Sequence, residues 1–335
     1  MTFSFDWGRD GGPVLILTLA SAGLIFLPSF LHPNGELGPK AALWLSVLLV
    51  YGLARELAYG RTSAFLTAGV YLSLGGILPQ AGPLLAAQNL TLLCGLLSRR
   101  NPFWSLGFGL GLGFWAGLNL SSAPGAVLGS LAFILWDTPR LLVSPLLWGG
   151  LALGLGPGLL GRDGLEPLVP VFSVSPGLLV VWVFPWGLIA APEWFRLGQS
   201  LISSWGKFCL LWGAGYGLWT LGSPSPTLLN WTPLLAITAL LAGRCLAAIW
   251  SQSFRAGEKL LQLGLRSWGF LLLALGGGGA LWGEEVWGFL GAALGGTFLM
   301  AAHLLEQERR ETVPLLLWGQ WVCLWGLGFA GVTGS

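Results

Sequence analysis

The chain has 335 residues, of which 54% are hydrophobic and only 9% are charged, and its mean hydropathy is +0.75. Soluble domains carry about 25% charged residues, so this composition excludes an ordinary water-soluble fold and indicates a polytopic membrane protein. The formal net charge of +2 is too small to indicate binding to nucleic acid.

Cuts at charged residues, prolines and polar clusters divide the chain into apolar segments. The fold class that they predict is all-α, a transmembrane helical bundle of about 11–13 spans. The first segment lacks a basic leader and a cleavage site, so we interpret it as a retained span. The predicted spans are 13–31, 41–59, 62–79, 83–98, 103–120, 122–137, 140–160, 174–192, 206–222, 229–250, 266–283, 286–304 and 313–333.

Basic residues are distributed very unevenly between alternate breaks. With the N-terminus placed inside, every Lys and Arg of the chain except Lys40 and Arg162 falls inside. Inside loops of membrane proteins are enriched in Lys and Arg, and one missed span would reverse the bias beyond it. The sequence therefore predicts an odd number of spans, with the N-terminus inside and the C-terminus outside.

Glycine-rich segments and amphipathic segments predict how some of the helices pack. Gly109, Gly113 and Gly117 recur every four residues and predict a face for close helix packing. The run Gly276–Gly279 favours either close packing or an unwound segment that lines a cavity. Residues 193–205 and 251–266 carry separate apolar and charged faces, which is typical of helices that lie on the membrane surface.

Metal and cofactor chemistry has few candidate ligands. The cysteines, Cys94, Cys209, Cys245 and Cys323, are widely spaced in apolar runs and form no CxxC pair, so we interpret them as small buried side chains. Two histidines offer little for a histidine-built metal, haem or chlorophyll site. We expect no resident cofactor, although an active enzyme of this kind could use a divalent cation.

Acids in the predicted outside loops are the candidates for chemistry. A carboxylate there can act as a general base or bind a divalent cation, while the ordinary alternative is a solvated loop acid. Glu284 and Glu285 form an acidic pair without a basic neighbour and are the alternative metal ligands. The outside acids are Glu36, Asp163, Glu166, Glu284 and Glu285.

Several segments, taken in order, form a pattern: Val50–Leu57 (VYGLAREL) with Gly60 and Arg61, Pro139–Trp148, Phe184–Gly187, Thr220–Ser223 and Leu229–Ala242. This pattern resembles the family-39-type membrane glycosyltransferases of the GT-C fold, which include protein O-mannosyltransferases and lipid A aminoarabinose transferases. The resemblance covers about 41–250 and leaves additional spans at about 266–333 within a single integral-membrane domain, 1–335.

The resemblance implies an outward-facing cavity for a polyprenyl-phosphate-linked sugar. In that family one acid lies in a long first outside loop, another acid follows the third span, and a basic residue often follows the fifth. Here the first loop is short and offers Glu36 as the base, with Lys40 or Arg162 near the donor phosphate. The second and third breaks hold Gln80 and Ser121-Ser122 instead. We therefore expect the fold to be kept, with weak or no catalysis.

Two other functions stay open. The chain is alternatively a non-catalytic subunit of a membrane complex whose Gly and Trp faces bind protein partners, lipids or pigments. A transporter is less favoured, because no charged residue falls near the middle of a predicted span. We expect a multi-pass protein of a bacterial inner membrane or an internal photosynthetic membrane.

Overall fold

The computed structural model describes residues 37–57, 60–75, 82–117, 123–165, 176–197, 206–214, 232–253, 258–281 and 285–329. These residues form helices and short turns, with no strand among them. The named helices are α2 Leu37–Glu56, α3 Arg61–Gly75, α4 Gly82–Leu97, α5 Trp104–Gly117, α6 Ala123–Asp137, the 3₁₀ helix η2 Pro139–Val143, α7 Pro145–Leu165, α8 Pro176–Leu197, α10 Thr232–Trp250, α11 Glu258–Leu281, α12 Glu285–Glu306 and α13 Thr312–Phe329. Residues 206–214 are helical as well.

Most predicted spans coincide with these helices, and the all-α prediction is confirmed for the described residues. The predicted span 13–31 lies outside them. The span predicted at 140–160 is wrong at its start, because η2 comes first and α7 begins only at Pro145. Proline suits a first helical position, since its φ is already helical and the amide hydrogen that it lacks has no partner there.

The two predicted surface helices are partly wrong. Residues 193–197 continue α8, and residues 258–266 form the first turns of α11. Residues 198–205 and 254–257 lie outside the described residues. The reason is burial: Leu197, Leu261 and Leu265 are each 1% exposed and join the main hydrophobic core. On α11, Lys259 and Arg266 are exposed and sit on the outer face, whereas Glu193 of α8 is itself buried.

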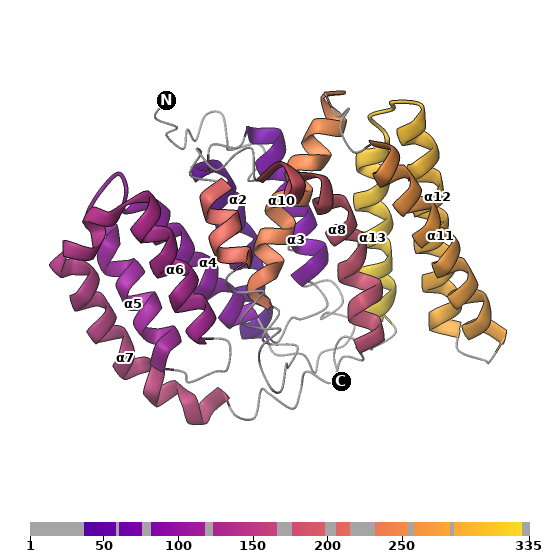
Figure 1. The fold of residues 1–335 in the computed structure, drawn as a ribbon. Coiled ribbons are helices and arrows are strands. Elements are labelled where there is room, and N and C mark those ends of the chain that lie inside the picture. Colours follow the sequence, from indigo (N-terminus) through magenta and orange to yellow (C-terminus); the bar gives the residue numbers. More distant parts are fainter. Residues whose placement is uncertain are drawn as a thin grey trace.

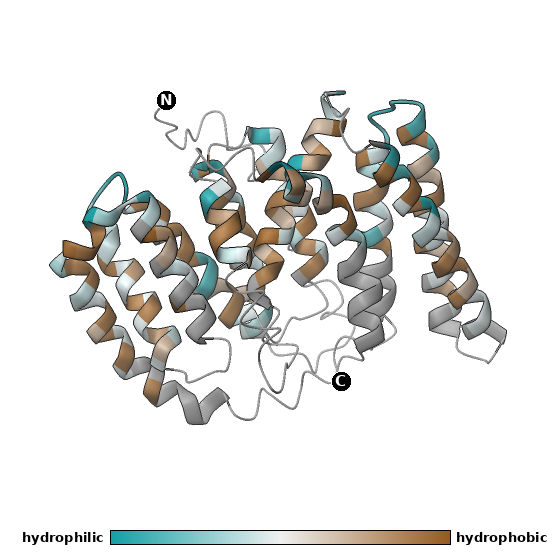
Figure 2. Ribbon diagram, in the orientation of Figure 1, coloured by the Kyte–Doolittle hydropathy of each residue, from teal (hydrophilic) through white to brown (hydrophobic). Residues whose placement is uncertain are grey.

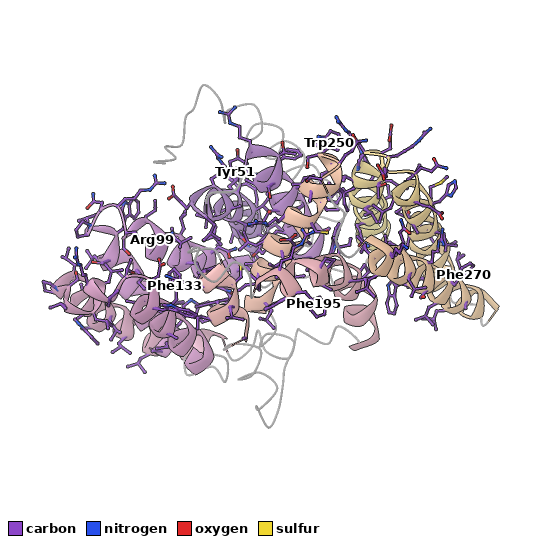
Figure 3. The ribbon with its side chains drawn as sticks, turned by 45° about the horizontal axis from the view of Figure 1, so that its top comes forward. Tyr51, Arg99, Phe133, Phe195, Trp250 and Phe270 are labelled. Carbon is purple, nitrogen blue, oxygen red and sulfur yellow. The ribbon has the colours of Figure 1, made fainter. Side chains whose placement is uncertain are left out.

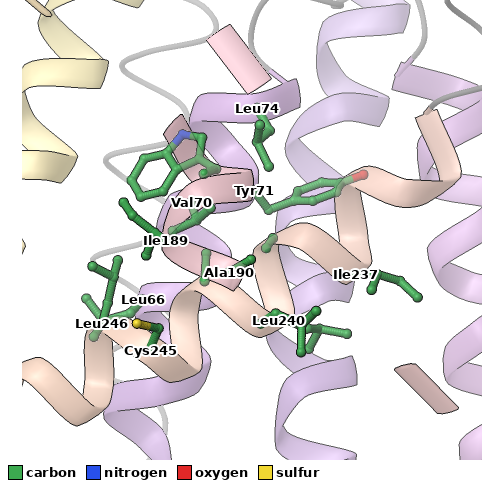
Figure 4. Close-up of a cluster of buried hydrophobic side chains, with 14 of the residues drawn as sticks. Leu66, Val70, Tyr71, Leu74, Ile189, Ala190, Ile237, Leu240, Cys245 and Leu246 are labelled. Carbon is green, nitrogen blue, oxygen red and sulfur yellow. The ribbon is translucent and has the colours of Figure 1, made fainter. Parts of the chain in front are cut away.

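The helices form a central group with a flank on either side. Helices α2, α3, α4, α8 and α10 occupy the centre, α5, α6 and α7 form one flank, and α11, α12 and α13 form the other (Figure 1). The core between α3, α8 and α10 contains fully buried side chains such as Tyr71, Ile189 and Leu240 (Figure 4). Burying apolar area of this kind is the main favourable term wherever these helices meet.

Helices α5 and α7 approach through reciprocal glycines. A Cβ at Gly109 or Gly113 would collide with the carbonyl oxygens of Leu147 and Leu151 in α7. In return, Gly150 and Gly154 of α7 lie against the α5 backbone. Gly117 is buried at the end of α5. Two backbones this close permit extensive van der Waals contact along the pair.

Glycines also join α11 to α12. Gly276 packs directly on Gly291, and Gly269 packs beside Gly295. Helix α11 stays continuous through the run Gly276–Gly279 to Leu281, so the run is not unwound. Close packing accounts for Gly276, whereas Gly277 and Gly278 have nothing within 4 Å of the position that a Cβ would take.

Helix length bears on the predicted membrane crossings. Within the described residues, one segment is both long and apolar enough to cross a membrane, Lys259–Gly278 in α11. Several others are shorter: α3 and α6 have 15 residues each and α5 has 14. At 1.5 Å per residue these rise about 21–23 Å, less than the roughly 30 Å of a hydrocarbon core. The number of crossings and their orientation remain predictions.

Candidate functional site

Ion pairs gather the charged helix ends at one end of the bundle. Arg100 Nη2 lies 2.9 Å from Glu56 Oε2, which joins the turn after α4 to the end of α2. Asp137, at the end of α6, pairs with Arg99 at 3.2 Å and with Lys207 at 3.4 Å. We call this the charged end, and its hydrophilic residues are seen along the top of Figure 2.

Further pairs extend the charged end across the bundle. The carboxylate of Glu193 is 2% exposed and contacts Arg196 at 2.8 Å and Arg244 at 3.2 Å. Arg266 of α11 pairs with Glu306 at the end of α12. All these helix ends belong to breaks that the sequence predicts to be inside. Because each buried carboxylate contacts two cations, we assign these pairs to structure and not to catalysis.

The predicted site residues that the structure describes, Lys40 and the backbones of Arg162 and Glu285, lie at the opposite end. Helix α2 finishes at the charged end, so Lys40 in its first turn is remote from it. Likewise α7 begins next to η2 and runs away from the charged end towards Arg162, and α12 begins at Glu285 and ends at Glu306. Of Arg162 and Glu285 the structure describes the backbone, and Glu36 and Glu284 lie outside the described residues.

One local prediction about this end is wrong. Arg162 and Asp163 were expected in a loop, but α7 continues to Leu165 and places both in its last helical turn. A basic residue near a helix C-terminus is favourable because the unpaired carbonyl groups there carry partial negative charge.

A buried polar cluster lies between α2, α3 and α4, on the side of Lys40. Asn89 Nδ2 donates to Tyr71 Oη at 2.8 Å and to Ser46 Oγ at 3.1 Å, and Ser46 Oγ donates to Tyr71 Oη at 2.8 Å. All three residues are at most 1% exposed, and Asn89 Oδ1 has no hydrogen-bond partner. Gly82, at the start of α4, packs on the backbone of Pro39 beside Lys40.

Sequence reasoning missed this cluster. Its members are single polar residues in three different apolar helices, separated by 18 to 43 positions, so no local spacing relates them. The one available signal was the polar pair Gln88-Asn89 inside an apolar run. The cluster offers neutral hydrogen bonds that fix the register of α2, α3 and α4 beneath the predicted site.

The described residues contain no group of three or more His, Cys, Asp or Glu side chains arranged to hold a metal ion. The weak metal alternative, Glu284 and Glu285, involves side chains outside this description. It remains a prediction.

A groove of about 610 Å³ lies at the charged end between α3, α10 and α13. We call it the α3–α13 groove. Its walls are almost entirely apolar, and a guanidinium stands at one side. The residues that define it include Arg61, Phe65, Trp250, Leu317, Trp318 and Trp321.

Comparison with known proteins identifies a shared fold. No protein-family model and no curated protein matches the chain. Two solved structures of ArnT from Cupriavidus metallidurans are similar: the apo state, with 15% identity and a TM-score of 0.61, and the state bound to undecaprenyl phosphate, with 16% identity and a TM-score of 0.59. Each match covers 93% of this chain and 67% of ArnT. The predicted GT-C-like fold is thereby confirmed.

Proposed function

We propose that this chain is an integral membrane protein that binds a polyprenyl-phosphate lipid at the end of the bundle opposite the charged end. The observation that carries the proposal is the likeness, over 93% of the chain, to ArnT bound to undecaprenyl phosphate. The positions of α2 and α7 support it, because they bring the backbones of Lys40 and Arg162 to one end.

The phosphate of the lipid is the group that this end is suited to hold. An ammonium such as that of Lys40 binds phosphate as a point charge, whereas the guanidinium of Arg162 can donate two parallel hydrogen bonds. Both would stabilise the charge that a polyprenyl phosphate gains when it leaves the sugar.

Sugar transfer at this site would need a general base. We nominate Glu36, which stands four residues before Lys40. Its carboxylate would remove the proton of the acceptor as the acceptor attacks the anomeric carbon and the bond to the phosphate breaks. Lipid binding and sugar transfer are therefore separable, since the first needs the cations and the second also needs Glu36.

The first experiment measures lipid binding. Purified protein is titrated with undecaprenyl phosphate and the bound lipid is counted by native mass spectrometry. We expect Lys40→Gln to weaken binding about tenfold, which corresponds to the loss of one charge-assisted hydrogen bond. Lys259→Gln makes the same charge change at the exposed start of α11 and should leave binding unchanged. Equal effects of the two substitutions, or no binding by the native chain, would refute the proposal.

The second experiment measures transfer in proteoliposomes that contain a polyprenyl-phosphate sugar. Glu36→Gln should abolish transfer while the bound lipid persists. Unchanged transfer would remove Glu36 as the base.

A non-catalytic role is the second candidate. It is favoured by Gln80 and by Ser121-Ser122, which stand where the resembling family has an acid and a basic residue. A membrane-protein partner that co-purifies in mild detergent, together with lipid binding without transfer, would support this role. Recovery as a lone chain would count against it.

A further inference from the structure

We propose that the α3–α13 groove binds an anionic glycerophospholipid, with one acyl chain in the groove and the phosphate at Arg61. This second lipid site lies at the charged end, away from the predicted polyprenyl-phosphate site, and does not rest on the proposed function.

The groove has the size and the polarity of a site for an amphipathic molecule. Its volume of about 610 Å³ falls within the roughly 300–1,000 Å³ of typical ligand pockets. Phe65, Leu317 and Trp321 supply apolar walls, whereas the polar groups, Arg61 and Thr62, come from the first turn of α3. Apolar walls with a charged group at one side match a lipid that has an apolar acyl chain and a charged headgroup.

The charge at the mouth favours an anion. Arg61 is exposed, and among the described residues that line the groove it is the one that carries a charge. Helices α3 and α13 both begin here, at Arg61 and Thr312, and helix N-termini carry partial positive charge. Basic pockets between membrane helices on the cytoplasmic side are suited to anionic headgroups, and the charged end is the one predicted to be inside.

The turns beside the mouth are fixed to each other. Gln252 Nε2 donates to the carbonyl oxygen of Glu308 at 3.0 Å, and Arg310 Nη2 donates to Gln252 Oε1 at 3.4 Å. These bonds join the turn after α10 to the turn before α13. The mouth therefore keeps its shape without a ligand, and a bound headgroup would meet a preformed surface.

Three indoles complete the site. The Trp321 indole N–H donates to the carbonyl oxygen of Gly69 at 3.4 Å, and the Trp318 and Trp321 ring centroids are 5.9 Å apart. Trp318 and Trp250 remain 63% and 41% exposed, and Trp250, labelled in Figure 3, is the last residue of α10. Tryptophan favours the headgroup level of a bilayer, where the phosphate of a phospholipid also lies.

The test compares two lipids with identical acyl chains, phosphatidylglycerol and phosphatidylcholine. Full-length protein is purified in mild detergent and offered an equal mixture, and native mass spectrometry counts the lipids retained. We expect preferential retention of phosphatidylglycerol, lowered about tenfold by Arg61→Gln because a charge-assisted contact to phosphate is lost. Arg140→Gln, an exposed arginine on η2 remote from the groove, is the matched control and should change nothing.

A second substitution tests the acyl-chain site separately. Thr62 is exposed at the groove, so Thr62→Trp should fill the groove without disturbing the core and should lower retention of both lipids. Equal retention of both lipids by the native chain, equal effects of Arg61→Gln and Arg140→Gln, or displacement of phosphatidylglycerol from the groove by undecaprenyl phosphate would each overturn the proposal.

Discussion

One carboxylate at the charged end, that of Asp137, illustrates how a single residue joins several parts of this bundle. Asp137 is 6% exposed and contacts both Arg99 and Lys207, so it ties α6 to the turn after α4 and to the helical residues 206–214. The Lys207 ammonium also lies 5.9 Å from the centre of the Trp136 ring. Removal of such an acid leaves two cations that have lost most of their solvent without their counter-charge.

We expect Asp137→Asn to lower the free energy of unfolding by about 3 kcal/mol, the cost of breaking a buried ion pair by removing one partner. The control is Glu306→Gln, because Glu306 and its partner Arg266 are 53% and 44% exposed. An exposed pair contributes at most about 1 kcal/mol. Unfolding in mixed detergent, followed by circular dichroism, measures both. Similar losses for the two variants would contradict a structural role specific to Asp137.

At the scale of elements, the packing of α5 against α7 requires glycine only on the side of α7 that faces α5. Gly150 faces the carbonyl oxygen of Leu106, whereas Gly149, one residue earlier, has nothing within 4 Å of the position that a Cβ would take. Adjacent glycines of one helix therefore serve different purposes: the first is free to carry a side chain, and the second is required by the contact.

Alanine at these two positions should change stability in opposite directions. Gly150→Ala forces α5 and α7 apart and should cost about 1–3 kcal/mol. Gly149→Ala removes the helix-weakening effect of glycine and should add about 0.5–1 kcal/mol. The melting temperatures of both variants in detergent measure the difference. A loss at both positions would mean that helix propensity does not govern the exposed face of α7.

Helices α10 and α12 end in a similar way. Gln252 and Glu308 have φ angles of 54° and 53°, in the left-handed region, and the residue after each donates its amide to a carbonyl oxygen five residues earlier. This is the Schellman pattern, in which glycine is preferred at the left-handed position. The Gln252 side chain makes the contact between the two turns at the mouth of the α3–α13 groove, whereas Glu308 supplies only its backbone carbonyl oxygen.

We expect Glu308→Gly to stabilise the chain by about 0.5 kcal/mol, because glycine adopts a positive φ without a steric cost. The Gln252 bond uses the backbone carbonyl of Glu308, so it is retained. Glu308→Ala removes the same carboxylate without this relief and should not stabilise. Thermal unfolding of both variants tests the expectation, and a gain shared by glycine and alanine would assign the effect to charge instead.

At the scale of the whole molecule, the two ends of the bundle differ in chemistry. Ion pairs join α2, α6, α8, α10, α11 and α12 at the charged end. The opposite end contains the start of α2 and the ends of α7 and α11. Uneven charge of this kind orients membrane proteins, with the basic end inside.

Reporter fusions test this orientation. Alkaline phosphatase fused after residue 335 should be active, since the C-terminus is predicted outside, and the same reporter inserted after Glu308 should be inactive. A fluorescent protein at these positions should give the reverse pattern. Activity after Glu308 would place the charged end outside and would contradict the predicted orientation.

Local patterns in the sequence predicted the helices but not their long-range contacts. Charge and proline mark helix ends, so α4, α6 and α12 are close to their predicted bounds. The start of α11 was misjudged because Glu258 and Lys259 resemble a surface helix, while Leu261 and Leu265 bury the opposite face. That burial depends on α8 and the rest of the core, which no local window contains.

For the candidate site, the sequence could predict only the end of the bundle at which its residues lie. Alternating charge placed Lys40, Arg162 and Glu285 at one end, and the directions of α2, α7 and α12 agree with that. The contacts of Ser46, Tyr71 and Asn89 could not be predicted, because each requires three helices to be packed in register. The α3–α13 groove likewise joins residues 61 and 321, which are far apart in sequence.

The glycine contacts of α11 and α12 have a consequence for biogenesis. Gly276 meets Gly291 only 15 residues later, across a connection that is short in sequence. Closing so short a loop costs little entropy, and contacts near in sequence form early. We therefore expect α11 and α12 to pair as a hairpin before α13 has been synthesised, so that the pair joins the rest of the bundle already packed.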